Sequence, residues 1–199
     1  MRVRQKVKNV LRGMLQTWGT PEVKRSLWNK EFSEGRWDFI DNTPGDPVYG
    51  YIEKYCRNGS ILDLGCGSGN TGNELAVGSY QRYTGVDVSD VAVEKAMRRT
   101  ARNGRSQKNS YFQSDISSFT PKHEYDVTLF RECIFYIPRI KLGAILDKYA
   151  KYLKPDGVFV VRMEDRYAYA DIVDLVEKNY RILERYVPSA CKTIVMVFR

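Results

Sequence analysis

The sequence predicts an α/β fold in which helices cover both faces of a doubly wound, mostly parallel sheet. Short apolar segments that are typical of buried strands alternate with segments of helical periodicity along residues 48–199. Strands separated by helices are expected to run parallel, because a parallel pair needs a long crossover connection. The last two strands are joined only by residues 188–192, which are too few for such a crossover. We therefore expect the final strand to run antiparallel.

The predicted elements follow one another in a regular order. Strands are expected at residues 61–64, 83–88, 110–113, 125–130, 158–163, 181–187 and 193–198, and helices at residues 48–55, 71–77, 89–103, 138–153 and 168–179. Ser89 is predicted to be the N-cap of the third of these helices, and Pro138 opens the fourth. Lys154, Pro155, Asp156 and Gly157 are predicted to form a turn.

The chain divides into a basic N-terminal segment, residues 1–47, and the predicted α/β domain, residues 48–199. Residues 1–30 hold eight Lys and Arg residues against Glu22 alone, which accounts for +7 of the formal net charge of +8. The remaining residues are almost balanced, so the basic composition does not indicate a broad nucleic-acid-binding surface. Nucleic acid is therefore not expected as a partner.

Apolar residues recur at helical spacing near the N-terminus, with basic residues between them: Val3, Val7, Val10, Leu11, Met14 and Leu15. One interpretation is a terminal helix that packs on the domain and leaves a solvated basic face. The alternative is a helix over residues 1–15 that lies on an anionic membrane or on a partner. Gly13, Gly19 and Pro21 argue against one long continuous helix.

Several features are typical of a cytoplasmic protein, and we expect that location. No apolar run approaches the roughly 20 residues of a membrane-spanning helix, and the charged N-terminus has no apolar signal core. The four cysteines, Cys56, Cys66, Cys133 and Cys191, are scattered without a CxxC pair. This pattern argues against a zinc site or a disulfide framework.

Four aromatic residues crowd the stretch between residues 28 and 40: Trp28, Phe32, Trp37 and Phe39. A solvated linker does not carry so many, so they either pack on the core or cover a binding site. Residues 42–47 have the composition of turns and are predicted to form a hinge. We predict that residues 28–50 roof the site and that Trp28 and Trp37 close over a ligand. The alternative is that both tryptophans fix the N-terminal segment to the sheet.

A glycine-rich loop follows the first predicted strand. Asp63 lies within that strand, and Gly65, Gly67 and Gly69 come directly after it. Glycine lets the backbone turn sharply and approach a ligand closely, and the next helix can begin with its N–H groups facing that ligand. Such a loop holds a nucleoside-containing cofactor. Residues 67–72 match the GxGxxG fingerprint of dinucleotide sites, but a carboxylate at Asp63 would repel a pyrophosphate and suits a cationic amino acid group.

Two further carboxylates end the second and third strands, and the topology brings them to the rim that holds the glycine loop. Asp87 lies 22 residues after Gly65, where a carboxylate can accept two hydrogen bonds from a ribose diol. It could instead cap the next helix, although Ser89 is better placed to do so. Asp115 could accept a hydrogen bond from an adenine amino group.

At this point the chain resembles the class I (Rossmann-like) S-adenosylmethionine-dependent methyltransferases of the small-molecule type, over about residues 50–199. The motifs that carry the resemblance lie at residues 62–69, 86–89, 113–116, 125–127 and 153–157. The resemblance implies a seven-stranded sheet in the order 3-2-1-4-5-7-6 with the last strand antiparallel. It also implies S-adenosylmethionine as the cofactor and S-adenosylhomocysteine as the product.

The resemblance further implies which residues contact the cofactor. Gly65, Gly67 and Gly69 would pack on the methionine part, Asp87 would bind the ribose, Val88 and Ile116 the two faces of adenine, and Asp115 its amino group. Asp63 and Cys66 of the same motif are also predicted to bind the cofactor, although Asp63 could instead hydrogen-bond the loop backbone. Phe130 and Arg131 would lie near the methionine end. Independently of the resemblance, the aromatic stretch predicts that Trp37 closes over the cofactor.

The segment after the fourth strand, residues 131–138, is expected to face the methyl acceptor. It is similar to the corresponding segment of O-methyltransferases of the ubiquinone-biosynthesis type, which has a glutamate and, four residues later, a histidine. Here Glu132 is present, but Tyr136 stands in the place of the histidine. Glu132 or Tyr136 is predicted to orient or deprotonate the acceptor. Alternatively, Glu132 pairs with Arg131 or with an arginine of the lid.

The predicted function is methylation of an oxygen or nitrogen atom on a small or mid-sized molecule, with Tyr167 and Tyr169 as walls of the acceptor site. His123 is the only histidine and is expected at the surface, so neither a metal cluster nor a histidine-based triad can be built. Two alternatives stay open. One is an RNA or protein methyltransferase that holds its target with the basic N-terminus, and the other is a cofactor-binding protein without catalysis.

Overall fold

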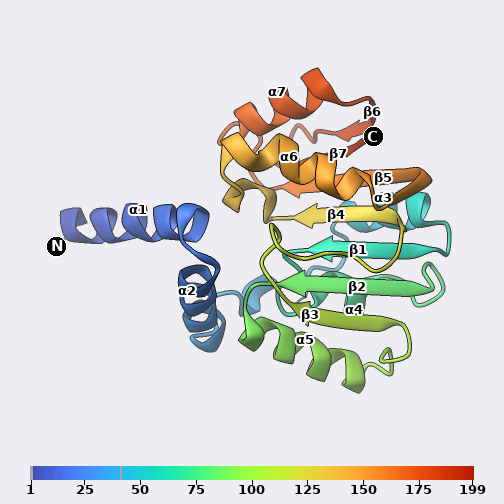
Figure 1. Cartoon of the computed structure of the whole chain (residues 1–199), viewed down its shortest axis with the longest axis horizontal. Coiled ribbons are helices and arrows are strands. Elements are labelled where there is room, and N and C mark those ends of the chain that lie inside the picture. The colour runs from blue at the N-terminus through green and yellow to red at the C-terminus, as the bar shows by residue number, and fades with distance from the viewer. Residues whose placement is uncertain (1, 41) are drawn as a thin grey trace.

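The computed structural model describes residues 2–40 and 42–199. Its centre is a seven-stranded sheet in the order β3-β2-β1-β4-β5-β7-β6 (Figure 1). The strands are β1 (Ser60–Leu64), β2 (Arg82–Asp87), β3 (Asn109–Gln113), β4 (Tyr125–Arg131), β5 (Leu153–Met163), β6 (Ile182–Tyr186) and β7 (Ile194–Phe198). Strands β1 to β5 are parallel, and β7 is antiparallel to both β5 and β6. The predicted order and the antiparallel last strand are confirmed.

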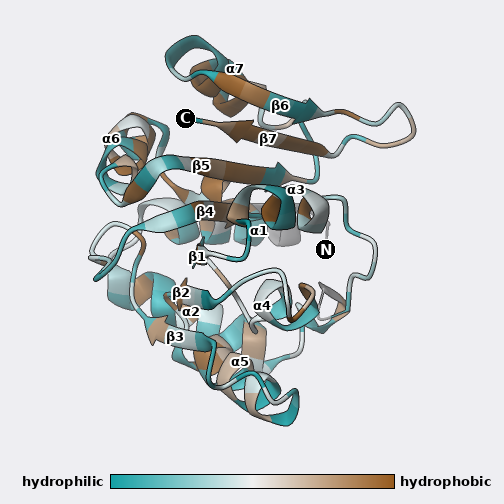
Figure 2. Cartoon of the chain, turned by 90° about the vertical axis from the view of Figure 1, so that its right-hand side faces the viewer, coloured by the Kyte–Doolittle hydropathy of each residue, from teal (hydrophilic) through white to brown (hydrophobic). Residues whose placement is uncertain are grey.

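Five helices belong to the α/β domain: α3 (Val48–Cys56), α4 (Asn70–Glu74), α5 (Asp90–Arg102), α6 (Arg139–Ala150) and α7 (Ala170–Asn179). Alternation along each strand divides the apolar side chains between two cores. Ile61 packs in one core with residues of α3 and α5, whereas Leu62 and Leu64 pack in the other with residues of α6 and α7. Figure 2 shows the resulting band of hydrophobic residues along β4, β5 and β7.

The strand register brings the predicted site residues to one rim. Leu64 at the end of β1 lies beside Val86 of β2 and Phe130 of β4. The residues that follow these positions, Gly65, Asp87 and Arg131, therefore lie together at the carboxyl ends of neighbouring parallel strands.

Two N-terminal helices, α1 (Arg2–Trp18) and α2 (Pro21–Ser33), lie at this rim (Figure 1). A helix over residues 21–33 was not expected, because Gly19 and Pro21 indicated an interruption. The interruption is real but short. Thr20 is the N-cap of α2, and its hydroxyl accepts from the Val23 N–H. Pro21 lies in the first turn, where a backbone N–H would have no acceptor within the helix, so the missing N–H of proline costs no hydrogen bond. Gly13 does not interrupt α1.

Within residues 8–18, the part of α1 whose side chains the structure describes, the large apolar residues do not pack on the domain, contrary to the first interpretation of this segment. Val10, Leu11, Met14 and Trp18 are exposed, and the helix contacts the protein instead through Arg12 and Gln16, as described below. Among residues 2–40 and 42–199, no helix combines the length and the apolar composition needed to cross a membrane.

The turn predicted at residues 154–157 lies within β5, which begins at Leu153. The register between β4 and β5 shifts here, because Tyr125 pairs with Leu153 while Val127 pairs with Val158. The extra residues form an irregularity in the strand rather than a connection before it. At Gly157 a Cβ would lie 2.8 Å from the Tyr125 carbonyl oxygen, so this close approach needs glycine.

Candidate active site

A cavity of about 390 Å³ lies at the carboxyl ends of the central strands, between the sheet and the two N-terminal helices. Ten of the predicted site residues line it: Trp37, Gly65, Gly67, Asp87, Val88, Asp115, Ile116, Arg131, Glu132 and Tyr136. Asp63, Cys66 and Gly69 lie in or behind the glycine loop without lining the cavity. Phe130 is fully buried in the core against the rings of Tyr149 and Phe159, so the structure does not bring it to the site.

The glycine loop is folded tightly over the end of β1. Gly65, Gly67 and Gly69 have φ values of 76°, 52° and 75°, which only glycine adopts without strain. A Cβ at Gly65 would lie 2.6 Å from that of Cys133, and one at Gly69 would lie 2.7 Å from that of Ala96. The loop therefore depends on all three glycines, although only two of them face the cavity.

Asp63 is buried beneath this loop. Its Oδ2 accepts a short hydrogen bond from the Tyr83 hydroxyl, while its Oδ1 is buried with no hydrogen-bond partner among the described residues. Burial raises the pKa of Asp63 to about 6. An unsatisfied carboxylate oxygen in such surroundings is costly, and a nearby ligand cation would stabilise its ionised form.

Asp87 ends β2 with both carboxylate oxygens held by backbone donors. The Ser89 N–H donates to Oδ1 and the Gly67 N–H to Oδ2, each at 2.9 Å. Ser89 itself is the N-cap of α5, since its hydroxyl accepts from the Ala92 N–H. The carboxylate thus keeps acceptor capacity toward the cavity that it lines, although burial raises its pKa to about 6.

Asp115 is paired with a lysine that the sequence did not single out. Lys24 of α2 donates to Asp115 Oδ2 at 3.3 Å, and Ser117 donates to Oδ1 through its N–H and its hydroxyl. Burial raises the pKa of Asp115, but these hydrogen bonds and the Lys24 charge outweigh burial and lower it overall. The carboxylate expected to meet an adenine amino group is therefore already bound to the N-terminal segment.

The N-terminal segment forms a roof that several polar contacts fix to α5. Asp90 accepts from Arg25 and from Asn29, both at 2.7 Å, and Lys95 donates to the Phe32 carbonyl at 2.7 Å. One face of α2 lines the cavity through Lys24, Trp28 and Phe32. These three residues are spaced four apart in the sequence, which places them on one side of a helix. This spacing would have predicted the cavity-lining side of α2 if Thr20 and Pro21 had been identified as the start of a helix.

Aromatic rings close the roof over the far end of the cavity. The Trp28 ring lies edge-to-face with Tyr136 at 4.9 Å and near Trp37 at 5.7 Å between centroids. The Trp37 indole N–H donates to Glu31 at 2.9 Å. Trp28 and Trp37 both line the cavity, and they also fix the N-terminal segment in place, so the two interpretations of these residues are compatible.

Glu132 follows β4 in a left-handed backbone conformation, with φ 57°, which is uncommon for a residue with a side chain and concentrates at functional sites. Its carboxylate pairs with Arg162 of β5, rather than with Arg131 or an arginine of the lid. Arg131 is engaged elsewhere, because its guanidinium bonds Asp46 at 2.9 Å and Thr43 at 2.7 Å.

The two candidate catalytic residues differ in their ionisation. Burial raises the pKa of Glu132 to about 7, against the opposing effect of Arg162. Burial also raises the pKa of Tyr136 far above neutrality. Glu132 can therefore exchange a proton near neutral pH, whereas Tyr136 stays protonated and serves only as a hydrogen-bonding group.

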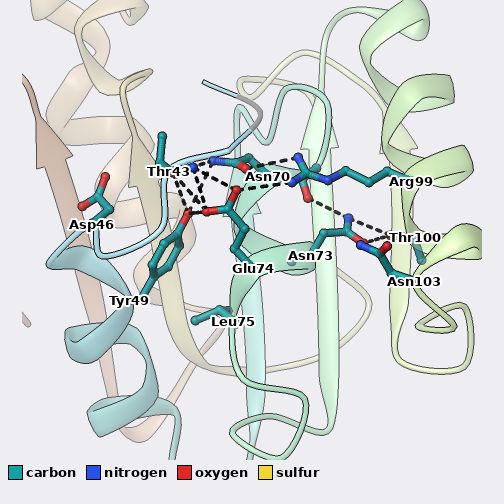
Figure 3. A network of polar contacts seen from close by, with 12 residues as sticks. Thr43, Asp46, Tyr49, Asn70, Asn73, Glu74, Leu75, Arg99, Thr100 and Asn103 are labelled. Atoms are coloured by element: carbon teal, nitrogen blue, oxygen red, sulfur yellow. Dashed lines mark hydrogen bonds and ion pairs between the residues drawn. The ribbon is translucent and has the colours of Figure 1, made fainter. Parts of the chain in front are cut away.

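The predicted hinge at residues 42–47 is held by a polar network behind the glycine loop (Figure 3). Glu74 of α4 accepts from the Thr43 N–H at 3.1 Å and from the Tyr49 hydroxyl at 2.6 Å. Arg99 of α5 donates to Asn70 at 3.1 Å and to Glu74 at 3.3 Å. Because Arg131 also bonds Thr43, this network connects the hinge to both helices after the loop and to the end of β4.

The remaining predictions concern residues away from the cavity. His123 is exposed, as expected, on the segment before β4. Tyr167 and Tyr169 do not line the cavity; Tyr169 instead stacks on Phe135, with 4.2 Å between ring centroids. Within the described parts of the chain, no group of three or more His, Cys, Asp or Glu side chains is arranged to hold a metal ion.

The chain is similar to known methyltransferases. The family model described as a methyltransferase domain matches residues 61–157. A ubiquinone biosynthesis O-methyltransferase of Rickettsia canadensis is 24% identical over 162 residues, which cover 80% of this chain and 66% of the relative. A sterol 24-C-methyltransferase of Aspergillus fumigatus is 29% identical over 102 residues, which cover 51% of this chain and 26% of the relative. The chain thus spans from about a quarter to two thirds of the length of these curated relatives.

Solved structures show the same fold. The 1,6-didemethyltoxoflavin-N1-methyltransferase of Burkholderia thailandensis, with bound 1,6-didemethyltoxoflavin and S-adenosylhomocysteine, matches with a TM-score of 0.72 at 17% identity, over 88% of this chain and 86% of that one. The chain thus contains a methyltransferase domain match over residues 61–157, and its strand order and fold are those of class I S-adenosylmethionine-dependent methyltransferases. The domain match and the fold favour S-adenosylmethionine over a dinucleotide as the cofactor.

Proposed function

We propose that this chain transfers the methyl group of S-adenosylmethionine to an oxygen or nitrogen atom of a small or mid-sized molecule. One observation carries the proposal. A single roofed cavity joins the residues predicted to bind the cofactor to Glu132 and Tyr136, the residues predicted to act on the acceptor. Its volume of about 390 Å³ is typical of small-molecule sites, and residues of α1 and α2 contribute part of its lining.

The carboxylates at the rim are suited to the parts of the cofactor. Asp63, buried behind the glycine loop, would attract the ammonium group of the methionine part by its charge. Asp87 would accept the ribose hydroxyls, and Asp115 would accept the adenine amino group between Val88 and Ile116. Bound S-adenosylmethionine supplies an activated, electrophilic methyl group. The main tasks left to the chain are alignment of the acceptor and exclusion of water, which the ring cluster of Trp28, Trp37 and Tyr136 would perform.

Glu132 is the proposed general base. With a pKa raised to about 7, a substantial fraction of its carboxylate is ionised at neutral pH and can accept the proton that an O–H or N–H acceptor loses. Arg162 would stabilise the ionised form. Tyr136, which stays protonated, would orient the acceptor by a hydrogen bond.

Two measurements test this function. Calorimetry is expected to show binding of S-adenosylhomocysteine but not of NAD, and labelled S-adenosylmethionine is expected to label small phenols, catechols or amines in a panel of acceptors. Binding of S-adenosylhomocysteine without transfer to any small molecule, RNA or protein fraction would instead indicate a protein that binds the cofactor without catalysis. Transfer confined to RNA, strongly salt-dependent and lost on deletion of residues 1–25, would contradict a small-molecule acceptor.

The pairing of Lys24 with Asp115 leads to a separate prediction about affinity. Because adenine binding must compete with Lys24 for this carboxylate, Lys24→Ala is expected to bind S-adenosylhomocysteine about three- to tenfold more tightly, or ~0.7–1.4 kcal/mol. Calorimetry measures the change. Lys30→Ala, an exposed lysine on the same helix, is the matched control and should bind as the unmodified chain does. Weaker binding by Lys24→Ala would mean that Lys24 holds the roof or the cofactor rather than competing with it.

A further inference from the structure

The outer face of α1 is apolar and has no partner within the described chain. Val10, Leu11, Met14 and Trp18 are each between 56% and 64% exposed. Val10, Met14 and Trp18 follow one another at intervals of four residues, and Leu11 lies beside them, so all four share one side of the helix. Figure 1 shows α1 projecting from the body of the protein past α2. Large apolar side chains gathered on one exposed face indicate an interaction surface.

The polar side of α1 holds the helix to the protein, which is the reverse of an ordinary surface helix. Gln16 is buried and donates to Glu31 of α2 at 3.2 Å. Arg12 pairs with the same carboxylate at 3.3 Å. Because these contacts fix the rotation of the helix, the apolar side is presented to the surroundings and cannot turn inward without breaking them.

Charge distinguishes the partners that could cover this face. Helix α1 holds five Lys and Arg residues and no acidic residue. Arg12 is paired with Glu31, whereas Lys8 is exposed. A helix with an apolar face and basic residues around it fits an anionic lipid surface, where the apolar side chains enter the acyl boundary and the cations meet the headgroups. Nucleic acid would engage the basic residues but would leave Val10, Leu11 and Met14 exposed.

The apolar face continues to the mouth of the cavity. Trp18 is part of this face and also lines the cavity, together with residues 16–21 of the junction between α1 and α2. Ile140 is 81% exposed and lies in the chain between Pro138 and Lys141, which also line the cavity. The surface that α1 presents is therefore next to the site rather than remote from it.

We propose that α1 binds an anionic lipid membrane through Val10, Leu11, Met14 and Trp18, with the mouth of the cavity facing the lipid. Lipid binding of this kind requires the fold but not methyl transfer, so it stands or falls independently of the proposed function.

Flotation with lipid vesicles tests the proposal on the full chain. Binding is expected to vesicles of phosphatidylcholine mixed with phosphatidylserine, to be weaker with phosphatidylcholine alone, and to decrease with salt. The double substitution Val10→Ser and Met14→Gln is expected to lower the partition coefficient at least about tenfold, because two apolar side chains no longer enter the lipid. Met97→Gln makes the same exchange at a methionine of α5 that is 49% exposed, and it should partition as the unmodified chain does.

Binding of S-adenosylhomocysteine, measured in parallel, reports whether each variant is folded, since neither Val10 nor Met14 lines the cavity. Failure of the unmodified chain to bind the mixed vesicles would overturn the proposal. So would equal partition of the double variant and the Met97→Gln control. Self-association that the double variant abolishes, in the absence of vesicle binding, would show that a second copy of the chain covers the face. RNA binding without vesicle binding would likewise assign the segment to another partner.

Discussion

Asp87→Asn is expected to lower the affinity for S-adenosylhomocysteine about a hundredfold. The carboxylate would bind two ribose hydroxyls, and charged hydrogen bonds contribute about 1.5 kcal/mol or more each, so that losing both costs about 3 kcal/mol. The asparagine amide would also direct an N–H group at either the Gly67 or the Ser89 backbone donor, which now share the two carboxylate oxygens. Isothermal calorimetry measures the loss. Asp156→Asn, at an exposed aspartate within β5, is the matched control.

The affinity for S-adenosylhomocysteine is expected to depend on pH through Asp87 and Asp63. Burial raises the pKa of Asp87 to about 6 and that of Asp63 to about 6, above the usual value for aspartate in an unfolded chain. The folded state without ligand is therefore favoured when both are protonated, and this stability is lost as the pH rises through about 6. Ligand binding needs the ionised forms, so affinity is expected to rise over the same pH range. Affinity that is flat between pH 5 and pH 8, in the unmodified chain, would contradict the roles of both carboxylates.

Glu132→Gln is expected to lower kcat by about a hundredfold to a thousandfold while leaving cofactor affinity nearly unchanged, because removal of a general base affects the transition state. With a pKa of about 7 for Glu132, the rate of the unmodified enzyme should rise with pH through that value as the carboxylate ionises. The variant should lack this rise. Steady-state kinetics across pH 5.5 to 9 with an acceptor found in the panel would measure both effects.

Glu164→Gln provides the control for this experiment. Glu164 is an exposed carboxylate close to Glu132, and its removal should preserve turnover while moving the pH-dependent rise slightly lower, because one negative charge that raises the Glu132 pKa is gone. Unchanged turnover in Glu132→Gln would mean that the pair with Arg162 is structural and that the acceptor needs no base from the protein.

The sheet was predictable because apolar residues recur with different periods in strands and in helices. The glycines after β1 were also informative, because closely spaced glycines indicate a tight turn. Asp63, Gly65 and Gly67 identified the turn at the end of β1, and their positive φ values explain why the residues are glycines there. The short segment 188–192 determined that β7 is antiparallel to β6. These features depend on residues close together in the sequence, which is where pattern and local stereochemistry act.

The roof could not be predicted in the same way. Gly19 and Pro21 predict an interruption of helical structure, and this interruption was expected. Thr20 and Pro21 also begin a new helix, and this second role was not predicted. The pairing of Lys24 with Asp115 joins residues 91 positions apart, and that of Glu132 with Arg162 joins residues 30 positions apart. Such pairs depend on tertiary packing, and no local pattern indicates them. For the same reason Phe130, adjacent to the site in sequence, points into the core.

Asp90 accepts hydrogen bonds from both Arg25 and Asn29, so one carboxylate on the first turn of α5 holds α2 above the cavity. A cofactor bound in this cavity would lie beneath that helix, and its exchange would then require these contacts to open. The hydrogen bond from Arg25 lowers the pKa of Asp90 to about 2, so acidity in the ordinary range does not release it. Dissolved salt does weaken contacts between exposed charges, and exchange of the nucleoside should therefore quicken as ionic strength rises.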